Sequence, residues 1–186
     1  MTELEQGRLG WLGERFRDQV FVQSYTPQIL IEGVRLLELK LFADEGGDFC
    51  EISRLDEGGY LSCLPDYRPA QISYSLMEPG TIKAWHLHEH QDDAWFVPPG
   101  QRVLVGLHDV RADSATPLST MRLALGIGAP RLLFIPRGVA HGVANLSTQP
   151  TMLVYFANQT FDSLDPDELR LPHDLLGIDF WSIHQA

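Results

Sequence analysis

The 186-residue sequence is poor in cysteine, and it lacks any long apolar run. Two cysteines, Cys50 and Cys63, are too few for a disulfide framework and predict reduced thiols in a cytoplasmic protein. No stretch reaches the roughly 18 apolar residues that cross a bilayer, so no membrane partner is expected. The first residues carry acids without an apolar segment, which does not fit a secretory signal.

Positive charge is also scarce: 14 Lys and Arg face 25 Asp and Glu, which gives a formal net charge of −11. Nucleic acid is therefore not an expected partner, because phosphate backbones bind to basic surfaces. A small phosphorylated ligand remains compatible, since it needs only a few local cations. The length and a hydrophobic content of 44% fit one domain with a core of its own.

The chain is predicted to divide into an N-terminal arm, residues 1–28, and a single β-rich domain, residues 29–186. Up to about residue 24, apolar residues recur at roughly helical spacing between charged residues. This pattern predicts a short helical arm that packs on the body or on a second subunit. The residues that carry it are Leu4, Leu9, Leu12, Phe16 and Val20.

From Ile29 onward, short apolar runs alternate with turn sequences such as DEGG, VPPG and GIGAP. Short strands at this spacing, without a long helix between them, predict an all-β sandwich or barrel. After Phe161 the chain returns to acids and prolines, and we expect turns and a short helix in this tail. The expected strands lie within residues 34–42, 70–76, 82–88, 94–98, 102–110, 121–127, 131–136, 141–146 and 151–157.

The segment WHLHEHQDD, residues 85–93, places three histidines at alternate positions ahead of two aspartates. Alternate residues of a strand share a face, so His86 and His88 are expected to point the same way. Imidazoles that face an interior are costly unless they bind a ligand or are hydrogen-bonded. The segment therefore predicts a metal site or an acid–base site.

This segment and a second one resemble the two motifs of the cupin family. In the first, His86, His88 and their flanking glycines fit the family's spacing, and Asp93 stands where cupins usually have Glu. The second reads PRGVAHGVAN, residues 136–145, and matches at its proline, first glycine, histidine and asparagine. The resemblance implies the double-stranded β-helix, or jelly-roll barrel, of that family.

The flanks resemble the dTDP-4-dehydrorhamnose 3,5-epimerase branch of the cupins, from about residue 32 to residue 181. No single match is specific, but their order along the chain is. The matching segments are DEGGDFCEISR at 44–54, AQISYSLMEPGTIKAWH at 70–86, PRGVAHG at 136–142, MLVYFANQTF at 152–161 and LLGIDFW at 175–181.

The resemblance implies roles for the matched residues and a homodimer in which a strand or arm is exchanged. His86 is expected to be the catalytic base, Tyr155 a proton donor or ring-stacking group, and His141 a wall of the sugar pocket. The other matches are expected to bind substrate: Gln71, Ser75 and Lys83 the sugar and diphosphate, and Phe49, Glu51 and Arg54 the nucleotide end.

These residue types suit proton abstraction next to a ketone. A 4-keto sugar has acidified protons at carbons 3 and 5, and a neutral histidine with a pKa near 6.5 is a suitable base. A tyrosine can return the proton on the other face of the enolate. The expected function is therefore epimerisation of a dTDP-4-keto-6-deoxyhexose type of nucleotide sugar, with no cofactor required.

Three positions depart from the family's pattern. Asp93 occupies the place of a lysine that is thought to stabilise the enolate, and Phe161 that of a second tyrosine. The aspartate that pairs with the base is sought beyond LGIDFW, where only a few residues remain, so His86 is expected to lack its carboxylate partner.

The first of these departures favours a metal site instead. His86, His88, Asp93 and His141 together make a set of three histidines and one carboxylate that suits iron, manganese, nickel or zinc. A divalent ion could replace the missing lysine in stabilising an enolate. Three hypotheses remain open: a nucleotide-sugar epimerase, a metal-dependent isomerase or oxygenase, and a non-catalytic protein that binds a nucleotide sugar.

Overall fold

The computed structural model of the chain describes residues 10–21 and 29–183, and two five-stranded antiparallel sheets form its body. The first sheet has the order β1-β9-β6-β11-β4 and the second the order β12-β5-β10-β7-β8. The strands are β1 (Arg35–Glu38), β2 (Leu41–Asp44), β3 (Gly47–Cys50), β4 (Gln71–Met77), β5 (Ile82–Leu87), β6 (Asp93–Phe96), β7 (Val103–Asp109), β8 (Thr120–Leu125), β9 (Arg131–Ile135), β10 (Val139–Ala144), β11 (Thr151–Ala157) and β12 (Leu169–Arg170).

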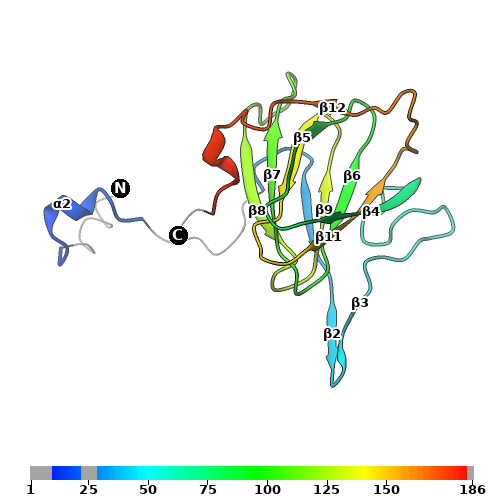
Figure 1. The fold of residues 1–186 in the computed structure, drawn as a ribbon, viewed down its shortest axis with the longest axis horizontal. Helices are drawn as coiled ribbons and strands as arrows, with labels where there is room; N and C mark the ends of the chain where they lie inside the picture. The colour runs from blue at the N-terminus through cyan, green and yellow to red at the C-terminus, as the bar shows by residue number, and fades with distance from the viewer. Residues whose placement is uncertain (1–9, 22–28, 184–186) are drawn as a thin grey trace.

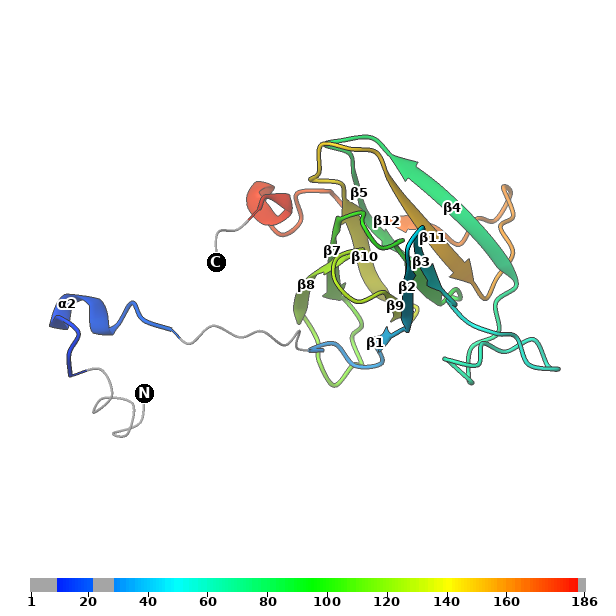
Figure 2. The same ribbon diagram turned by 90° about the horizontal axis from the view of Figure 1, so that it is seen from below.

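The two sheets face each other as a jelly roll, with β5, β7 and β10 opposite β6, β9 and β11 (Figures 1 and 2). They pack as separate sheets and do not close into one continuous barrel. The predicted all-β cupin fold is confirmed, although the expected strand at 34–42 is two strands, β1 and β2. The short strands β3 and β12 were not predicted.

The core lies between the sheets and follows from alternation along the strands. Strand β8 alternates half-buried and buried residues, and its buried set, Met121, Leu123 and Leu125, packs between the sheets. The neighbouring strand β7 contributes Val103, Val105 and Leu107 to the same cluster, and the opposite sheet contributes residues such as Leu133 and Leu153. This core leaves one end of the space between the sheets for polar side chains.

The predicted N-terminal arm is helical only over α2 (Glu14–Arg17) within the described residues. Residues 1–9 and 22–28, which carry the rest of that prediction, lie outside the described part of the chain. Along 10–21 and 29–183 there is no helix with the length and apolar character to cross a membrane. Trp11 and Phe21 flank α2 and are largely exposed, so the described arm leaves aromatic surface uncovered.

The C-terminal tail ends in the short 3-10 helix η1 (Ile178–Trp181), as the sequence predicted. Its Phe180 and Trp181 pack on the outer side of the second sheet, with ring centroids 5.1 and 4.9 Å from that of Trp85. Gly106 of β7 and Gly142 of β10 leave the space that these rings occupy. The tail is therefore docked against the back of the strand that carries His86.

We predict that Gly106→Ala destabilises the protein by about 1–3 kcal/mol, the usual cost of overpacking. A Cβ at this position would come within 2.6 Å of Phe180, 2.7 Å of Trp181 and 2.9 Å of Trp85, so the tail must shift. Urea unfolding measures the change. Gly46→Ala is the control, because the only close contact there is Asp44 Oδ1 at 3.4 Å. Equal stability of the two variants would contradict this account of tail docking.

Candidate active site

Three histidines meet in the space between the two sheets. His86 of β5 lies opposite His141 of β10 in the ladder, and their rings stack with centroids 6.0 Å apart. His88, just after β5, places its ring 5.3 Å from that of His141. The prediction that His86 and His88 face one interior is therefore confirmed, and His141 joins them from the second motif.

A bulge in the β5–β10 ladder brings a cation to the same face. His141 pairs with His86, but Val143 pairs with Lys83, so three steps along β5 match two along β10. Without the bulge, Lys83 and His86 would point to opposite faces, since they are three residues apart. Lys83 Nζ donates a hydrogen bond of 2.5 Å to Ser75 Oγ on β4, across the space between the sheets.

His86 has a carboxylate partner, so the expectation that it lacks one is wrong. Glu168 Oε1 lies 3.2 Å from His86 Nδ1, and the residue comes directly before β12, which pairs with β5. The carboxylate can only accept, so Nδ1 carries the proton and Nε2 is the bare nitrogen of a neutral ring. This partner lies before LGIDFW, whereas the family resemblance places the carboxylate after that segment.

Arg170 of β12 completes this group. Its Nη1 donates to His86 Nε2 over 2.8 Å, and its Nη2 contacts Glu168 Oε1. Burial lowers the pKa of His86 to about 4, the Arg170 charge adds to this, and Glu168 opposes it. The base candidate is thus neutral, with a carboxylate 3.2 Å from Nδ1 and a hydrogen bond at Nε2.

His88, Asp93 and His141 form a second, buried cluster whose nearest ligand atoms all lie within 4.8 Å of one another. Asp93 Oδ2 is 3.7 Å from His88 Nε2 and 3.6 Å from His141 Nε2. The Nδ1 atoms of the two rings face the backbone carbonyls of Asp167 and Val139, so both bare nitrogens point at the carboxylate. The structure thus groups three of the four predicted metal ligands, whereas Nε2 of the fourth, His86, faces Arg170.

Burial controls the protonation of this cluster. It raises the pKa of Asp93 to about 6 and lowers that of His141 to about 3, because neither charged form is well solvated there. Asp93 also accepts hydrogen bonds from Gln91 Nε2 at 2.9 Å and Trp95 Nε1 at 3.3 Å. Gln91 Nε2 also lies 3.4 Å from His88 Nε2, so the need for a proton or a cation shared with Asp93 is greatest at His141 Nε2.

Asp167 organises the loop that carries the histidines. Its carboxylate accepts hydrogen bonds from the backbone N–H groups of Glu89, His90 and Gln91, at 2.8 to 3.0 Å. Its own carbonyl faces His88 Nδ1. Burial raises the pKa of Asp167, but these backbone hydrogen bonds outweigh that effect, so its pKa lies below the ordinary value. His90 lies in this loop and is exposed.

The segment 167–170 was missed as a source of site residues. It lies in a tail rich in acids and prolines that matched no motif. One signal was present: Glu168 and Arg170 are two positions apart in an extended stretch, so they share a face. Nothing in the sequence indicated that this face meets β5.

The first sheet supplies the other wall of the site. Tyr155 of β11 pairs with Ser73 of β4 and packs against the core between the sheets, and Ser75 pairs with buried Leu153. Gln71 Nε2 donates to Ser73 Oγ, and Gln71 Oε1 accepts from the backbone N–H of Phe161. Gln71, Ser75, Lys83 and Tyr155 thus share the interior face with the histidines, and their roles remain predictions.

The predicted nucleotide-binding residues are not brought to this site within one chain. Phe49 belongs to the β2–β3 hairpin, which projects away from the jelly roll (Figure 1). Glu51 and Arg54 follow it and pair with each other at 2.9 Å on an exposed surface. A second copy of the chain is needed if these residues are to reach a site.

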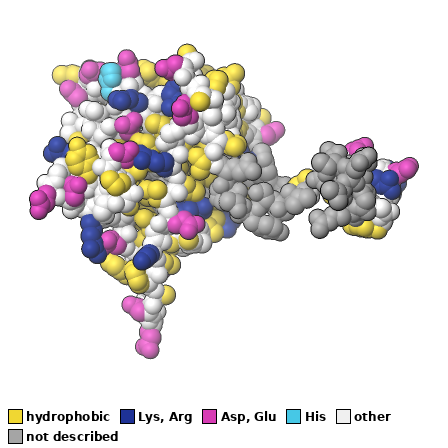
Figure 3. All heavy atoms as spheres, turned by 180° about the vertical axis from the view of Figure 1, so that it is seen from behind, with side chains coloured by type: hydrophobic (Ala, Val, Ile, Leu, Met, Phe, Trp, Pro, Cys, Tyr) yellow, Lys and Arg dark blue, Asp and Glu magenta, His cyan; other side chains and the backbone are white. Residues whose placement is uncertain are grey.

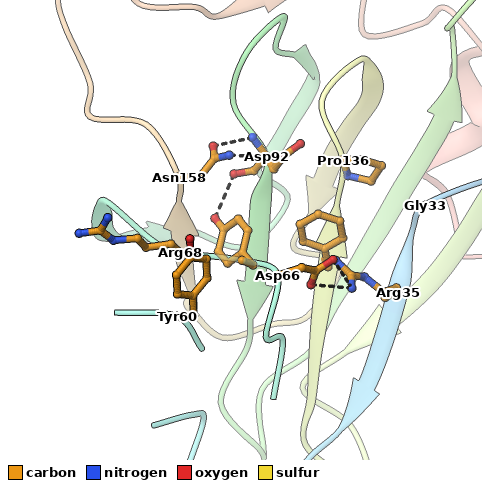
Figure 4. A pocket seen from close by; sticks show the side chains of 10 residues that line it. Gly33, Arg35, Tyr60, Asp66, Arg68, Asp92, Pro136 and Asn158 are labelled. Carbon is orange, nitrogen blue, oxygen red and sulfur yellow. Dashed lines mark hydrogen bonds and ion pairs between the residues drawn. The ribbon is translucent and has the colours of Figure 1, made fainter. Parts of the chain in front are cut away.

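A cavity of about 720 Å³ lies elsewhere, on the outer side of the first sheet (Figure 4). Arg35 pairs there with Asp66 and lies 4.3 Å from the Phe134 ring centroid, and Tyr67 donates to two backbone carbonyls. Asn158 holds Asp92 by hydrogen bonds at 2.8 and 2.9 Å. The contacts of Asp66 and Tyr67 fasten the loop before β4 to the sheet, and none of the histidines lines the cavity.

Comparison with known proteins places the chain among sugar-nucleotide enzymes. It is 41% identical over 145 residues to the spore coat polysaccharide biosynthesis protein SpsL of Bacillus subtilis (strain 168), covering 78% of this chain and 91% of the relative. It is 31% identical over 144 residues to the probable low-salt glycan biosynthesis epimerase Agl13 of Haloferax volcanii, covering 77% and 89%.

A solved structure and a family model agree with these relatives. The dTDP sugar isomerase of Desulfovibrio desulfuricans G20 superposes with a TM-score of 0.70 at 26% identity, covering 86% of this chain and 98% of that one. The sequence model described as dTDP-4-dehydrorhamnose 3,5-epimerase matches residues 28–186. The predicted family is confirmed: the chain belongs to the dTDP-4-dehydrorhamnose 3,5-epimerases and is an enzyme of the isomerase class.

Proposed function

We propose that His86 is the base with which this chain epimerises a dTDP-4-keto-6-deoxy sugar. The observation that carries the proposal is the Glu168–His86 pair, which fixes the tautomer with a bare Nε2. A carboxylate on Nδ1–H also stabilises the imidazolium that forms when the base takes a proton. The relatives support the substrate class, since one solved relative is named a dTDP sugar isomerase and two others serve polysaccharide or glycan biosynthesis.

The reaction needs no oxidant. His86 Nε2 takes the proton from the carbon beside the ketone, the C–H bond breaks, and its electron pair moves to the ketone oxygen as an enolate. Tyr155 O–H, on the opposite sheet, returns a proton to the other face, so a new C–H bond forms and the ketone is restored. Exchange of His86 and Tyr155 with solvent then resets both groups.

We predict that His86→Ala lowers solvent-deuterium uptake at the carbons next to the ketone by about a hundredfold to ten-thousandfold, the usual contribution of a general base. Glu168→Gln should slow uptake less, because an amide oxygen still orients the ring without stabilising its charge. Proton NMR of the nucleotide sugar in D₂O measures both.

Glu89→Gln is the matched control for Glu168→Gln, since Glu89 is an exposed glutamate near the same strand. A His86→Ala variant that exchanges as fast as the parent would overturn the role of His86. Tight binding of the nucleotide sugar by the parent protein without any exchange would show that this sugar is not the substrate that the chain epimerises.

We further propose a homodimer in the cytoplasm. The free thiols of Cys50 and Cys63 are compatible with a reducing compartment.

The β2–β3 hairpin exposes Phe42 and Phe49, whose rings lie 6.3 Å apart, and it protrudes from the body with acidic residues at its tip (Figure 3). Edge strand β4 exposes a second apolar row on its outer face: Ile72, Tyr74 and Leu76. A hairpin from a second copy would cover apolar surface and bring Phe49, Glu51 and Arg54 to the partner's nucleotide end.

We predict that the parent protein has twice the 20.9 kDa mass of one chain in sedimentation equilibrium. The double change Tyr74→Lys and Leu76→Lys should shift it toward the single-chain mass, because both side chains are exposed on the proposed contact face. Leu164→Lys is the control, since Leu164 is 93% exposed on the tail. A parent that sediments as one chain would exclude the dimer.

A second candidate function is supported by the His88–Asp93–His141 cluster. Two imidazole nitrogens and a carboxylate oxygen are a donor set that suits zinc, iron, manganese or nickel. Both rings are oriented by backbone carbonyls at Nδ1, as in metal sites where the second nitrogen is fixed by a hydrogen bond. A bound divalent ion would supply Lewis acidity beside His86, in place of the family's lysine.

We predict that metal analysis distinguishes the two candidates. If the cluster is a metal site, protein purified without a nickel column should hold about one equivalent of one transition metal, and His88→Ala should lose it. His90→Ala is the control, since His90 is exposed nearby. A parent protein that stays metal-free after incubation with zinc, manganese and iron(II) and gel filtration would exclude the metal-dependent candidate.

A further inference from the structure

Arg170 is fixed beside the base by backbone pairing. Strand β12 pairs with β5 so that Leu169 lies opposite Leu87 and Arg170 opposite His86. The residue before this strand, Glu168, contacts His86 Nδ1, and Asp167 binds the loop 89–91. The backbone of the segment is therefore anchored on both sides of the imidazole.

The Arg170 side chain covers the nitrogen that must act as the base. With Nδ1–H facing Glu168 Oε1 at 3.2 Å, the free lone pair of His86 is on Nε2, and this atom accepts a 2.8 Å hydrogen bond from Arg170 Nη1. A lone pair engaged in this way is not available to a carbon-bound proton. The guanidinium of Arg170 therefore blocks the basic nitrogen of His86, and it has to move away before proton abstraction can start.

Two properties let Arg170 leave. Its side chain is 55% exposed, so it can turn toward solvent without opening the core. Leaving breaks its hydrogen bond to a neutral imidazole and its Nη2 contact with Glu168 Oε1, and a diphosphate, which carries more than one negative charge, replaces both with charge-assisted, bidentate contacts. Lys83, the other cation near His86, is tied to Ser75 and contacts neither nitrogen of the ring.

We infer that Arg170 is a diphosphate-binding residue that uncovers His86 only when the diphosphate of the substrate draws its guanidinium away. The inference rests on the proposed function and deepens it, because it couples proton abstraction to anchoring of the nucleotide end. A 4-keto sugar without a diphosphate does not displace Arg170, so His86 Nε2 stays blocked and proton abstraction is slow. Binding of a group remote from the reacting carbon is in this way used to activate the chemistry.

The test supplies the keto sugar and the diphosphate as two separate molecules. The parent protein is incubated in D₂O with a free 4-keto-6-deoxyhexose at high concentration, with and without inorganic pyrophosphate. Pyrophosphate should increase deuterium uptake into the sugar several-fold, because it draws Arg170 from His86 Nε2. The same pyrophosphate should inhibit turnover of the intact nucleotide sugar by competition. No effect on the free sugar, or inhibition there too, would overturn the inference.

Arg170→Ala supplies the second measurement. Uptake into the free sugar should be faster than in the parent and insensitive to pyrophosphate. The KM for the nucleotide sugar should rise on the order of tenfold to a hundredfold, the equivalent of one hydrogen bond to a charged group. Slower exchange with both substrates would show that Arg170 only supports the fold, and would overturn the inference.

Arg68→Ala is the matched control, because Arg68 is an exposed arginine at the outer cavity, and it should behave as the parent does. Failure of this inference is distinguishable from failure of the proposed function. If the parent protein exchanges no deuterium into the intact nucleotide sugar, the proposed function fails. If it does so but pyrophosphate and Arg170→Ala leave free-sugar exchange unchanged, only the role of Arg170 fails.

Discussion

The pairing of β12 with β5 is the constraint on which the candidate site depends. Two residue pairs make it, with reciprocal backbone hydrogen bonds between Trp85 and Leu171 beside them, and it brings Arg170 against His86, a residue 84 positions earlier in the chain. Glu168 and Asp167 come with it, one contacting the imidazole and the other the loop beyond it. Because η1 packs behind Trp85 on the other face of the same strand, the tail holds β5 from both sides.

An oxygen atom facing Nδ1 gives the three histidines a common orientation. His86 faces a carboxylate there, and His88 and His141 face backbone carbonyls. In neutral rings this leaves three bare Nε2 atoms in a small volume, an arrangement that a buried site tolerates only if each has a partner. Arg170 donates to that of His86 and Gln91 lies 3.4 Å from that of His88, whereas Asp93, an acceptor when ionised, can pair with those of His88 and His141 only through a shared proton or a cation. Acid–base chemistry and metal binding both start from such nitrogens, which is why this site supports two candidates.

Asp93 changes the electrostatics of the site relative to the family's lysine. A buried carboxylate disfavours negative charge nearby, so an enolate needs stabilisation from another group. The cations of the site, Lys83 and Arg170, act on His86, and Arg170 contacts its ring. A proton or a metal ion within the cluster would neutralise Asp93, and the two candidates differ in which of these is present.

The sequence by itself determined the fold class and most of the interior side chains. Strand alternation and turn residues report burial locally, and the two histidine motifs combine fixed spacing with the glycines and prolines that the fold requires. For this reason His86, His88, Asp93 and His141 were found with their neighbours Lys83, Ser75 and Tyr155. The sequence did not show that His86 belongs to one group and that His88, Asp93 and His141 form another. Spacing along a strand does not tell which ring nitrogen faces which neighbour.

Only the tertiary structure decided the partners of the base. Glu168 and Arg170 lie in an irregular tail whose composition carries no periodic signal beyond their alternate positions. Their contact with His86 comes from a strand pairing across more than 80 residues, and such long-range pairings are set by packing of the whole chain. The same holds for the hairpin with Phe49: its sequence matches a substrate-binding segment, but its direction away from the chain's own site is visible only in three dimensions.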